Sequence, residues 1–300
     1  MNSGLQIIAS CSELIYKLQK TNKAKNIVPL IKDAIYSLLY EKIYNPNNFI
    51  NYFCSHNSDF IRGAQYCSQN FIRTLIININ DEYLRQNLDL VYKNDQYYPS
   101  IKEENEYKKF INRICSESKV QSLFFNITKS FSKDKCKYCR KDIQNFSFSY
   151  YIEYNLYLDE IRSYRWNFSH ILDLNIGNSN ILTMDCPYCK RKINIKEETK
   201  FIKLPDIFIF TLERYQGETN NVEIISDPFI YMNNYIDPNL KVDNTKYELF
   251  AINIRYGRTA NFGHEICQVK RDGIWYEINY KTGNISFIIY IVYIFIYIWI

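Results

Sequence analysis

His264 is one of only three histidines in the 300-residue chain, and it lies in the stretch NFGHEICQVKRDGIWYEINY. Asp272 and Gly273 separate two strand-like runs there, and Asp-Gly is the strongest short-range signal for a two-residue hairpin turn. Such a turn places Asn279 opposite Ile266 and diagonal to His264, at a backbone distance of about 7–8 Å that two polar side chains can bridge. A histidine oriented by an asparagine provides two residues of a cysteine-protease triad, and a polar pair at the end of a sheet is the alternative.

Two Cys-x-x-Cys pairs are the most specific local signal: CKYC at Cys136 and Cys139, and CPYC at Cys186 and Cys189. Nine cysteines placed at random would give on the order of 0.3 such pairs, and paired knuckles of this kind usually hold a tetrahedral zinc ion. The long spacer implies that each knuckle closes a separate hairpin and that a sheet brings the two together. Four thiolates leave zinc no open position, so we expect a structural metal, with chance pairs or redox thiols as alternatives.

The composition sets a frame for these motifs. A chain that is 47% hydrophobic can bury a substantial core, in one large domain or two smaller ones. The net charge of +5 is mild and spread along the chain, so it does not indicate a nucleic-acid partner. The cysteines are odd in number and no signal-peptide pattern is present, which favours a reducing intracellular setting, the cytoplasm and/or the nucleus.

Helical spacing dominates the first 120 residues. Apolar residues recur at helical intervals over 5–18, 27–43, 71–83 and 107–114, and after about residue 120 the pattern becomes that of strands. IFIF at 207–210 is a continuous apolar run that suits a strand buried on both faces. YELFAINIRY at 247–256 alternates in a way that predicts a strand with one wetter face.

Taken in order, the motifs resemble those of the ubiquitin-specific proteases, the ubiquitin carboxyl-terminal hydrolases that act as cysteine deubiquitinases. The resemblance covers roughly residues 1–285, and each stretch is weak alone whereas five in the same order are specific. The stretches are MNSGLQ at 1–6, similar to the end of an Asn-Thr-Cys-Tyr-Met-Asn-Ser box, GAQYCSQNF at 63–71, the two cysteine knuckles, LPDIFIFTLERY at 204–215, and YGRTANFGHE at 256–265 followed by WYEIN at 275–279.

The resemblance implies an α+β, papain-like fold in a single catalytic-type domain over residues 1–286. That domain has a helical thumb over about 1–120, β fingers with a zinc ribbon over 121–200, and a β-sheet palm over 201–286. His264 is then the general base, Asn279 the residue that orients it, and the four knuckle cysteines the ligands of a structural zinc. The implied activity is thiol-dependent hydrolysis of (iso)peptide bonds at the C-terminus of ubiquitin, with ubiquitin and ubiquitinated proteins as partners.

The nucleophile of the resembled box stands two residues before the position of Met1. We therefore expect that the sequence begins just after it, at an internal Met, and that the oxyanion-hole side chain lies upstream as well. Cys11 is about 18 Å further along a helix, and Cys267 points to the opposite face of the strand from His264. The other cysteines outside the knuckles are interpreted as buried thiols, namely Cys54, Cys67 and Cys115.

Four positions depart from the resembled motifs. Cys67 and Asn70 stand where the second box has Asp and Glu, Glu265 replaces the aromatic residue after the histidine, and Tyr280 replaces an acidic residue after Asn279. A catalytically inactive pseudoenzyme or scaffold that binds ubiquitin is therefore the second functional hypothesis. A third is a zinc-ribbon protein unrelated to ubiquitin, and the sequence leaves the oligomeric state open.

The resemblance ends near residue 285, and FIIYIVYIFIYIWI at 287–300 stands in place of a closing palm strand. These 14 apolar residues are short of the roughly 20 that span a bilayer. We interpret them first as read-through of a short AT-rich intron, outside the domain. A tail anchor, which would add a membrane contact, and a genuine, aggregation-prone strand are the alternatives.

Overall fold

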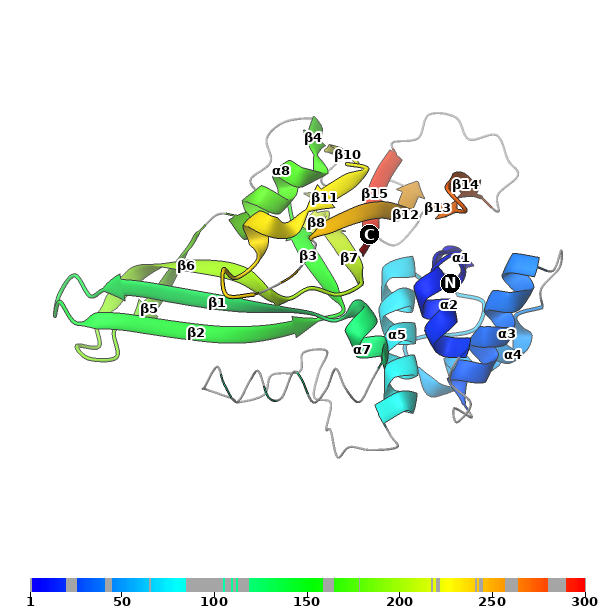
Figure 1. Cartoon of the computed structure of the whole chain (residues 1–300), viewed down its shortest axis with the longest axis horizontal. Coiled ribbons are helices and arrows are strands. Elements are labelled where there is room, and N and C mark those ends of the chain that lie inside the picture. The colour runs from blue at the N-terminus through cyan, green and yellow to red at the C-terminus, as the bar shows by residue number, and fades with distance from the viewer. Residues whose placement is uncertain are drawn as a thin grey trace.

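The computed structural model gathers its first helices at one end of the molecule and extends two β-sheets from them (Figure 1). The structure describes residues 2–19, 26–40, 45–64, 66–84, 119–158, 165–177, 179–216, 218–219, 222–240, 245–256, 264–279 and 290–299, together with a few single positions between these ranges.

The helical part of the chain, called the thumb below, consists of α1 (Asn2–Ala9), α2 (Ser12–Gln19), α3 (Ile27–Tyr40), α4 (Asn47–His56), α5 (Ser68–Leu84) and α7 (Lys119–Phe124). The helices predicted over 27–43 and 71–83 are confirmed as α3 and α5. The helix predicted over 107–114 lies outside the described residues, apart from single positions.

The prediction of one helix over 5–18 is wrong, because the chain breaks between α1 and α2. Ser10 Oγ donates to the carbonyl of Gln6 at 2.8 Å and accepts from Arg271 Nε at 2.8 Å. The Ser10 backbone N–H also donates to the Gln6 carbonyl at 3.1 Å, whereas the N–H of Cys11 donates to Ile8, three residues back, at 3.1 Å, and this tighter turn ends α1 at Ala9. Cys11 therefore begins a new direction of the chain and does not continue the first helix.

A four-stranded antiparallel sheet forms the fingers. Its order is β2–β1–β6–β5, with bounds β1 (Asn126–Lys135), β2 (Asp142–Tyr151), β5 (Asn180–Asp185) and β6 (Lys192–Lys203). The first knuckle joins β1 to β2, the second joins β5 to β6, and β1 pairs with β6. The prediction of two knuckles on separate hairpins, brought together by a sheet, is confirmed.

A seven-stranded sheet forms the palm, in the order β14–β13–β12–β15–β7–β3 with β11 paired to β12. Its strands are β3 (Glu153–Tyr157), β7 (Ile207–Glu213), β11 (Phe229–Tyr231), β12 (Lys246–Tyr256), β13 (His264–Arg271), β14 (Ile274–Ile278) and β15 (Tyr290–Trp299). The pairs are antiparallel except for β3 with β7, which is parallel.

The strand β15 corrects the interpretation of 287–300 as a tail outside the domain. Its residues lie between β12 and β7 and pair with both, so the described part of that segment belongs to the middle of the sheet. The side chains over 294–297 are buried. A strand covered on both faces reads as a continuous apolar run, which is why its sequence lacks the polar alternation of a surface strand.

The prediction that the strand over 247–256 has one wetter face is also wrong, because all side chains over 249–254 in β12 are buried. Two hydrophobic clusters cover the two faces of the palm, one continuous with the thumb and one on the far side. The strand β7 is likewise buried along its length up to Leu212, as the IFIF run predicted. Both faces of β12 are buried because a hydrophobic core covers each of them, and the alternation of residues within one strand does not show this.

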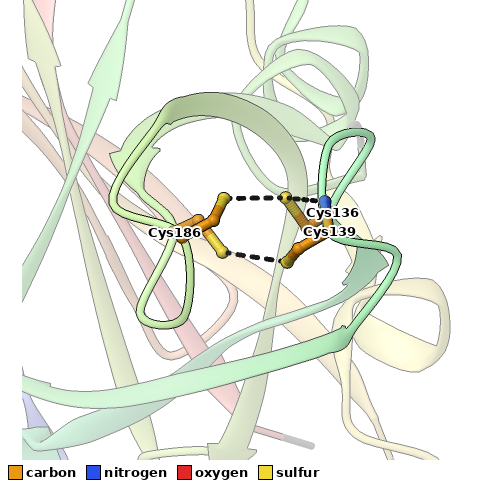
Figure 2. A group of neighbouring side chains, drawn as sticks. Cys136, Cys139 and Cys186 are labelled. Atoms are coloured by element: carbon orange, nitrogen blue, oxygen red, sulfur yellow. Dashed lines mark hydrogen bonds between the residues drawn. The ribbon is translucent and has the colours of Figure 1, made fainter.

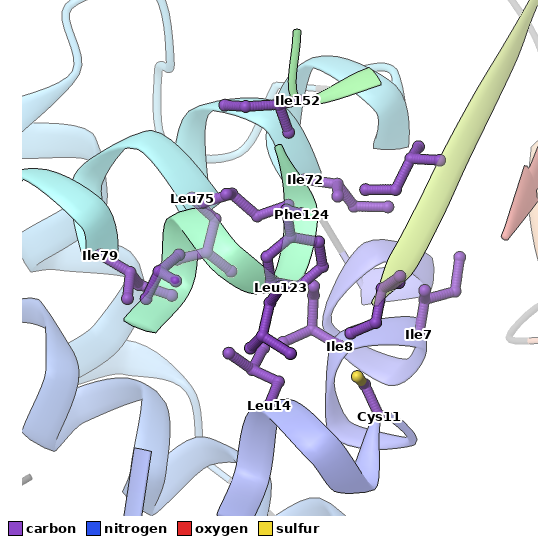
Figure 3. Close-up of a cluster of buried hydrophobic side chains, with 14 of the residues drawn as sticks. Ile7, Ile8, Cys11, Leu14, Ile72, Leu75, Ile79, Leu123, Phe124 and Ile152 are labelled. Atoms are coloured by element: carbon purple, nitrogen blue, oxygen red, sulfur yellow. The ribbon is translucent and has the colours of Figure 1, made fainter. Parts of the chain in front are cut away.

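The thumb packs on the palm through α1, α5 and α7, whose apolar side chains interlock (Figure 3). Gly4 permits the close approach of α1 to α5, since a Cβ there would lie 2.6 Å from Cδ1 of Phe71. Cys11 is buried among these side chains at the end of α1. Glu82 of α5 accepts from the backbone N–H groups of Asn26 and Val28, at 2.6 and 2.9 Å, and so caps the start of α3.

Short elements cover the far side of the palm and connect it to the fingers. They are β4 (Arg165–Asn167), α8 (Phe168–Leu172), the π-helix η1 (Asp173–Gly177), β8 (Tyr215–Gln216), β9 (Glu218–Thr219), β10 (Glu223–Ile225) and the 3-10 helix η2 (Met232–Tyr235). Among the described residues, no helix has the length and apolar character needed to cross a membrane.

Candidate functional site

His264 and Asn279 meet at one end of the β13–β14 hairpin. The two strands pair Arg271 with Ile274 across a turn at Asp272 and Gly273, whose φ angles are 50° and 80°. Positive φ at both central residues is the geometry that Asp-Gly supports in a two-residue hairpin. The register brings His264 Nε2 to 2.8 Å from Asn279 Oδ1, so the predicted contact between these side chains is confirmed.

The hydrogen bond assigns different tasks to the two ring nitrogens. An amide oxygen only accepts, so Nε2 of His264 carries the proton in this pair and Nδ1 is the basic nitrogen of the neutral ring. His264 is half-buried, and Asn279 is exposed. The pair therefore has the arrangement of a base and the group that orients it.

The first helix lies along β13, with its start next to His264. Ser3 Oγ donates to the carbonyl of Glu265 at 3.1 Å, and at the other end Arg271 donates to Gln6 Oε1 at 2.9 Å and to Ser10. Met1 lies outside the described residues. A thiol at the start of α1 would gain from unpaired backbone N–H groups and from the helix dipole, which both lower a thiol pKa.

Two cysteines near this place are held as neutral thiols. Burial raises the pKa of Cys267 to about 12. Burial first, and then the negative charge of Glu265, raise the pKa of Cys67 to about 11. Because the thiolate is the nucleophile, neither residue is activated for attack. The remaining cysteines outside the knuckles are Cys11, which is buried, Cys54, which is half-buried, and Cys115, which lies outside the described residues.

Glu265 joins several elements around the histidine. Its Oε2 accepts from the backbone N–H of Ser68 at 2.9 Å and from the Ser68 hydroxyl, at the start of α5. Its Oε1 lies 3.6 Å from Nη1 of Arg255 on the neighbouring strand β12. Sequence reasoning singled out Glu265 only as a departure from an aromatic residue. No local pattern predicts the contact, because Ser68 is 197 positions away.

The four knuckle cysteines converge at the tip of the fingers (Figure 2). Their sulfur atoms all lie within 4.8 Å of one another, with 3.7 Å between Cys136 and Cys189 and 3.8 Å between Cys139 and Cys186. Four sulfurs about 2.3 Å from a tetrahedral zinc ion would be separated by about 3.8 Å. The spacing therefore fits a four-thiolate metal site.

The two knuckles are built alike. Arg140 and Lys190 adopt positive φ angles of 58° and 59° and donate backbone hydrogen bonds to the carbonyls of Cys136 and Cys186. The backbone N–H of Cys139 points at the Cys136 sulfur at 3.5 Å, and this contact is the largest of the causes that lower the pKa of Cys136 to about 6. Backbone N–H groups directed at sulfur favour the thiolate that binds zinc.

The chain matches a known family over nearly its whole length. The family model described as ubiquitin carboxyl-terminal hydrolase covers residues 1–285. Ubiquitin carboxyl-terminal hydrolase 23 of Arabidopsis thaliana is 24% identical over 169 residues, which are 54% of this chain and 19% of that protein. The chain thus spans about a fifth of the length of this curated relative.

Solved structures of deubiquitinating (DUB) modules have the same fold. The SAGA Ubp8/Sgf11/Sus1/Sgf73 DUB module bound to ubiquitin aldehyde has a TM-score of 0.69 and 17% identity, covering 100% of this chain and 67% of the matched one. A yeast SAGA DUB module with an Sgf73 mutant has a TM-score of 0.71 and 17% identity, covering 100% and 66%. The predicted α+β fold with thumb, fingers and palm is confirmed.

Proposed function

Because the chain belongs to the ubiquitin carboxyl-terminal hydrolase family, we propose that it provides the catalytic domain of a cysteine deubiquitinase, which hydrolyses the (iso)peptide bond after the C-terminal glycine of ubiquitin. The observation that carries the proposal is the 2.8 Å contact of His264 with Asn279, beside the first turn of α1. That contact supports a general base held next to a helix start where a nucleophilic thiol would be activated.

The proposed reaction uses His264 twice. Nδ1 takes the proton of the nucleophilic cysteine thiol, and the thiolate attacks the carbonyl carbon of the terminal glycine. The imidazolium then gives its proton to the departing amine, and a thioester remains on the cysteine. In the second half, His264 takes a proton from water, which attacks the thioester and releases ubiquitin and the free thiol. Asn279 keeps Nε2 protonated and the ring oriented throughout.

We propose that zinc binds Cys136, Cys139, Cys186 and Cys189, with a structural role. The core at the fingertip supports this because it is small: among the described residues, its buried apolar side chains beside the cysteines are Ile143, Ile193 and Ile195. A metal bound by four protein ligands adds folding free energy where a hydrophobic core is too small to supply it.

An inactive ubiquitin-binding protein is the second candidate. The raised pKa values of Cys67 and Cys267 favour it, because they exclude these two thiols as nucleophiles. Both candidates take ubiquitin and ubiquitinated proteins as partners, without nucleic acid. Both also require an intracellular location, the cytoplasm and/or the nucleus, where ubiquitin conjugates and reduced thiols occur.

The test measures release of a fluorophore from the C-terminus of ubiquitin by three proteins. They are the chain with the sequence above, the same chain preceded by Asn-Thr-Cys-Tyr, and the preceded chain with His264→Ala. The proposal expects turnover in the second protein alone. Turnover by the first would assign a different nucleophile, and turnover that survives His264→Ala would remove the triad. Binding of ubiquitin without turnover by any of the three would favour the inactive candidate.

A further inference from the structure

Glu265 is placed to control where His264 lies. Alternate residues of a strand point to opposite faces, so the Glu265 side chain lies on the thumb face of β13 with Cys267 and Val269, which are buried in the thumb-side cluster. Its carboxylate is 14% exposed, and the Arg255 side chain opposite is 11% exposed. This is a largely buried carboxylate directly after the catalytic histidine in the chain.

The carboxylate meets the start of α5, where backbone N–H groups lack partners within the helix. One oxygen takes both the N–H and the hydroxyl of Ser68, and the other pairs with Arg255 at 3.6 Å. A negative charge at a helix start is favourable, and its buried donors lose their partner if it is removed. The Glu265 side chain therefore fixes β13 to both α5 and β12.

The backbone of the same residue fixes a third element. The Glu265 carbonyl accepts the Ser3 hydroxyl at 3.1 Å, in the first turn of α1. Ser3 is itself buried. Glu265, the residue directly after His264, thus joins the starts of two thumb helices to two palm strands.

We propose that Glu265 is the positioning residue of the site: it locks the His264 strand against the first turns of α1 and α5, and so sets the imidazole relative to the nucleophile. The effect of Glu265 on kcat rests on the proposed function, whereas its structural role in holding β13 against α1 and α5 does not. Substitution of Glu265 should therefore lower kcat and leave the KM for ubiquitin nearly unchanged, because its carboxylate is largely buried against Ser68 and Arg255.

A thiol stands beside the Glu265 carboxylate at this junction. Cys67 precedes Ser68 and lies close enough to Glu265 for that charge to raise the thiol pKa. The motifs that the sequence resembles have the acid at the position of Cys67 and an aromatic residue at that of Glu265. In this chain the carboxylate stands on the strand side of the junction, at Glu265, and a thiol stands on the helix side, at Cys67.

The first experiment substitutes Glu265→Gln in the chain preceded by Asn-Thr-Cys-Tyr, with Glu277→Gln as the matched control on the exposed β14 strand. We expect amide hydrogen exchange over 68–71 to become at least tenfold faster, and kcat to fall at least tenfold with KM within twofold. Glu265→Asp should recover part of both, and the control should change neither. Unchanged exchange over 68–71 would overturn the lock, whether or not the parent protein turns over ubiquitin.

The second experiment moves the carboxylate back. Cys67→Asp alone puts two carboxylates together and should lower the thermal midpoint, whereas Cys67→Asp with Glu265→Gln should recover most of that loss. Recovery of the midpoint together with kcat would support the assignment. If the losses of thermal midpoint in the two single variants simply add in the double variant, a carboxylate at residue 67 cannot replace the one at residue 265. That result would overturn the assignment.

Discussion

The imidazole of His264 depends on the asparagine that holds it. The 2.8 Å contact to Asn279 Oδ1 fixes which ring nitrogen carries the proton, and an imidazole with the wrong nitrogen protonated is no base toward a thiol. In a chain supplied with the upstream cysteine, Asn279→Ala should lower kcat on the order of 10- to 100-fold, which corresponds to about 1.4–2.8 kcal/mol of lost transition-state stabilisation.

The control for this prediction is Asn279→Asp, which keeps an oxygen acceptor for Nε2. Steady-state release of a fluorophore from ubiquitin should show most of the parent kcat in the Asp variant. Equal loss in the Ala and Asp variants would mean that the ring does not need this acceptor.

Cys267 gives the protein a stability that depends on pH. Burial raises the pKa of its thiol from 9.0 to about 12, so between these values the folded chain keeps a proton that the unfolded chain has lost. The stabilising contribution is therefore complete below pH 9 and is lost as the pH rises toward 12, at no more than about 1.4 kcal/mol per pH unit. Urea denaturation at pH 8, 9, 10 and 11 measures the free energy of unfolding, which should fall less steeply with pH for Cys267→Ala than for the parent. Equal slopes for the two proteins would contradict this prediction.

At the scale of the elements, the proposed zinc ion should stabilise the fingers. Cys186→Ser should release zinc and lower the stability of β5 and β6, while the helices keep their far-UV signal, because the fingertip cluster is separate from the thumb core. Atomic absorption on the purified proteins measures the metal. Equal zinc content in the parent and the variant would contradict the assignment of Cys186 as a ligand. The control is Tyr188→Ala, a substitution of an exposed neighbour that leaves the four cysteines intact and should retain zinc.

The close contact of α1 with α5 depends on Gly4, which has no Cβ. Gly4→Ala places a Cβ 2.6 Å from the ring of Phe71, which real contacts do not allow, so the helices must separate at a cost of about 1–3 kcal/mol. Gly177→Ala is the control, because its added Cβ would meet nothing closer than 3.6 Å. Chemical denaturation of the two variants should therefore differ, and equal stabilities would show that α1 yields without cost.

Local signals predicted several elements correctly, and the reason is physical. The Asp272-Gly273 turn demands φ angles that few residues adopt, and a Cys-x-x-Cys knuckle is closed by the residue that directly follows it, so both motifs are determined by a few neighbouring residues. The contact of Ser10 at the end of α1 was not predictable in this way, because Arg271, which donates to its hydroxyl, is 261 positions away. The lock at Glu265 is another such long-range contact.

At the scale of the whole molecule, the same limit explains the strands that sequence reasoning misjudged. Both β12 and β15 are buried on two faces because the thumb core lies against one side of the palm and a second core against the other. Whether an apolar run is such a strand or a segment outside the fold is decided by what covers it, and the run itself does not contain that information.

The position of β15 leads to a prediction for the whole fold. This strand pairs with β12 on one side and β7 on the other, so its removal would leave two apolar strands with unpaired edges at the centre of the palm. A chain that ends at residue 289 should therefore be largely unfolded or aggregated, as measured by the soluble fraction and the thermal midpoint. Ile296→Asp, with a charge at a side chain that is 2% exposed, should lower the free energy of unfolding by several kcal/mol. Ile181→Asp on the exposed side of β5, where the side chain is 71% exposed, should change that free energy by less than about 0.5 kcal/mol. A soluble, cooperatively unfolding protein without residues 290–300 would show that β15 is dispensable and would restore the interpretation of a tail.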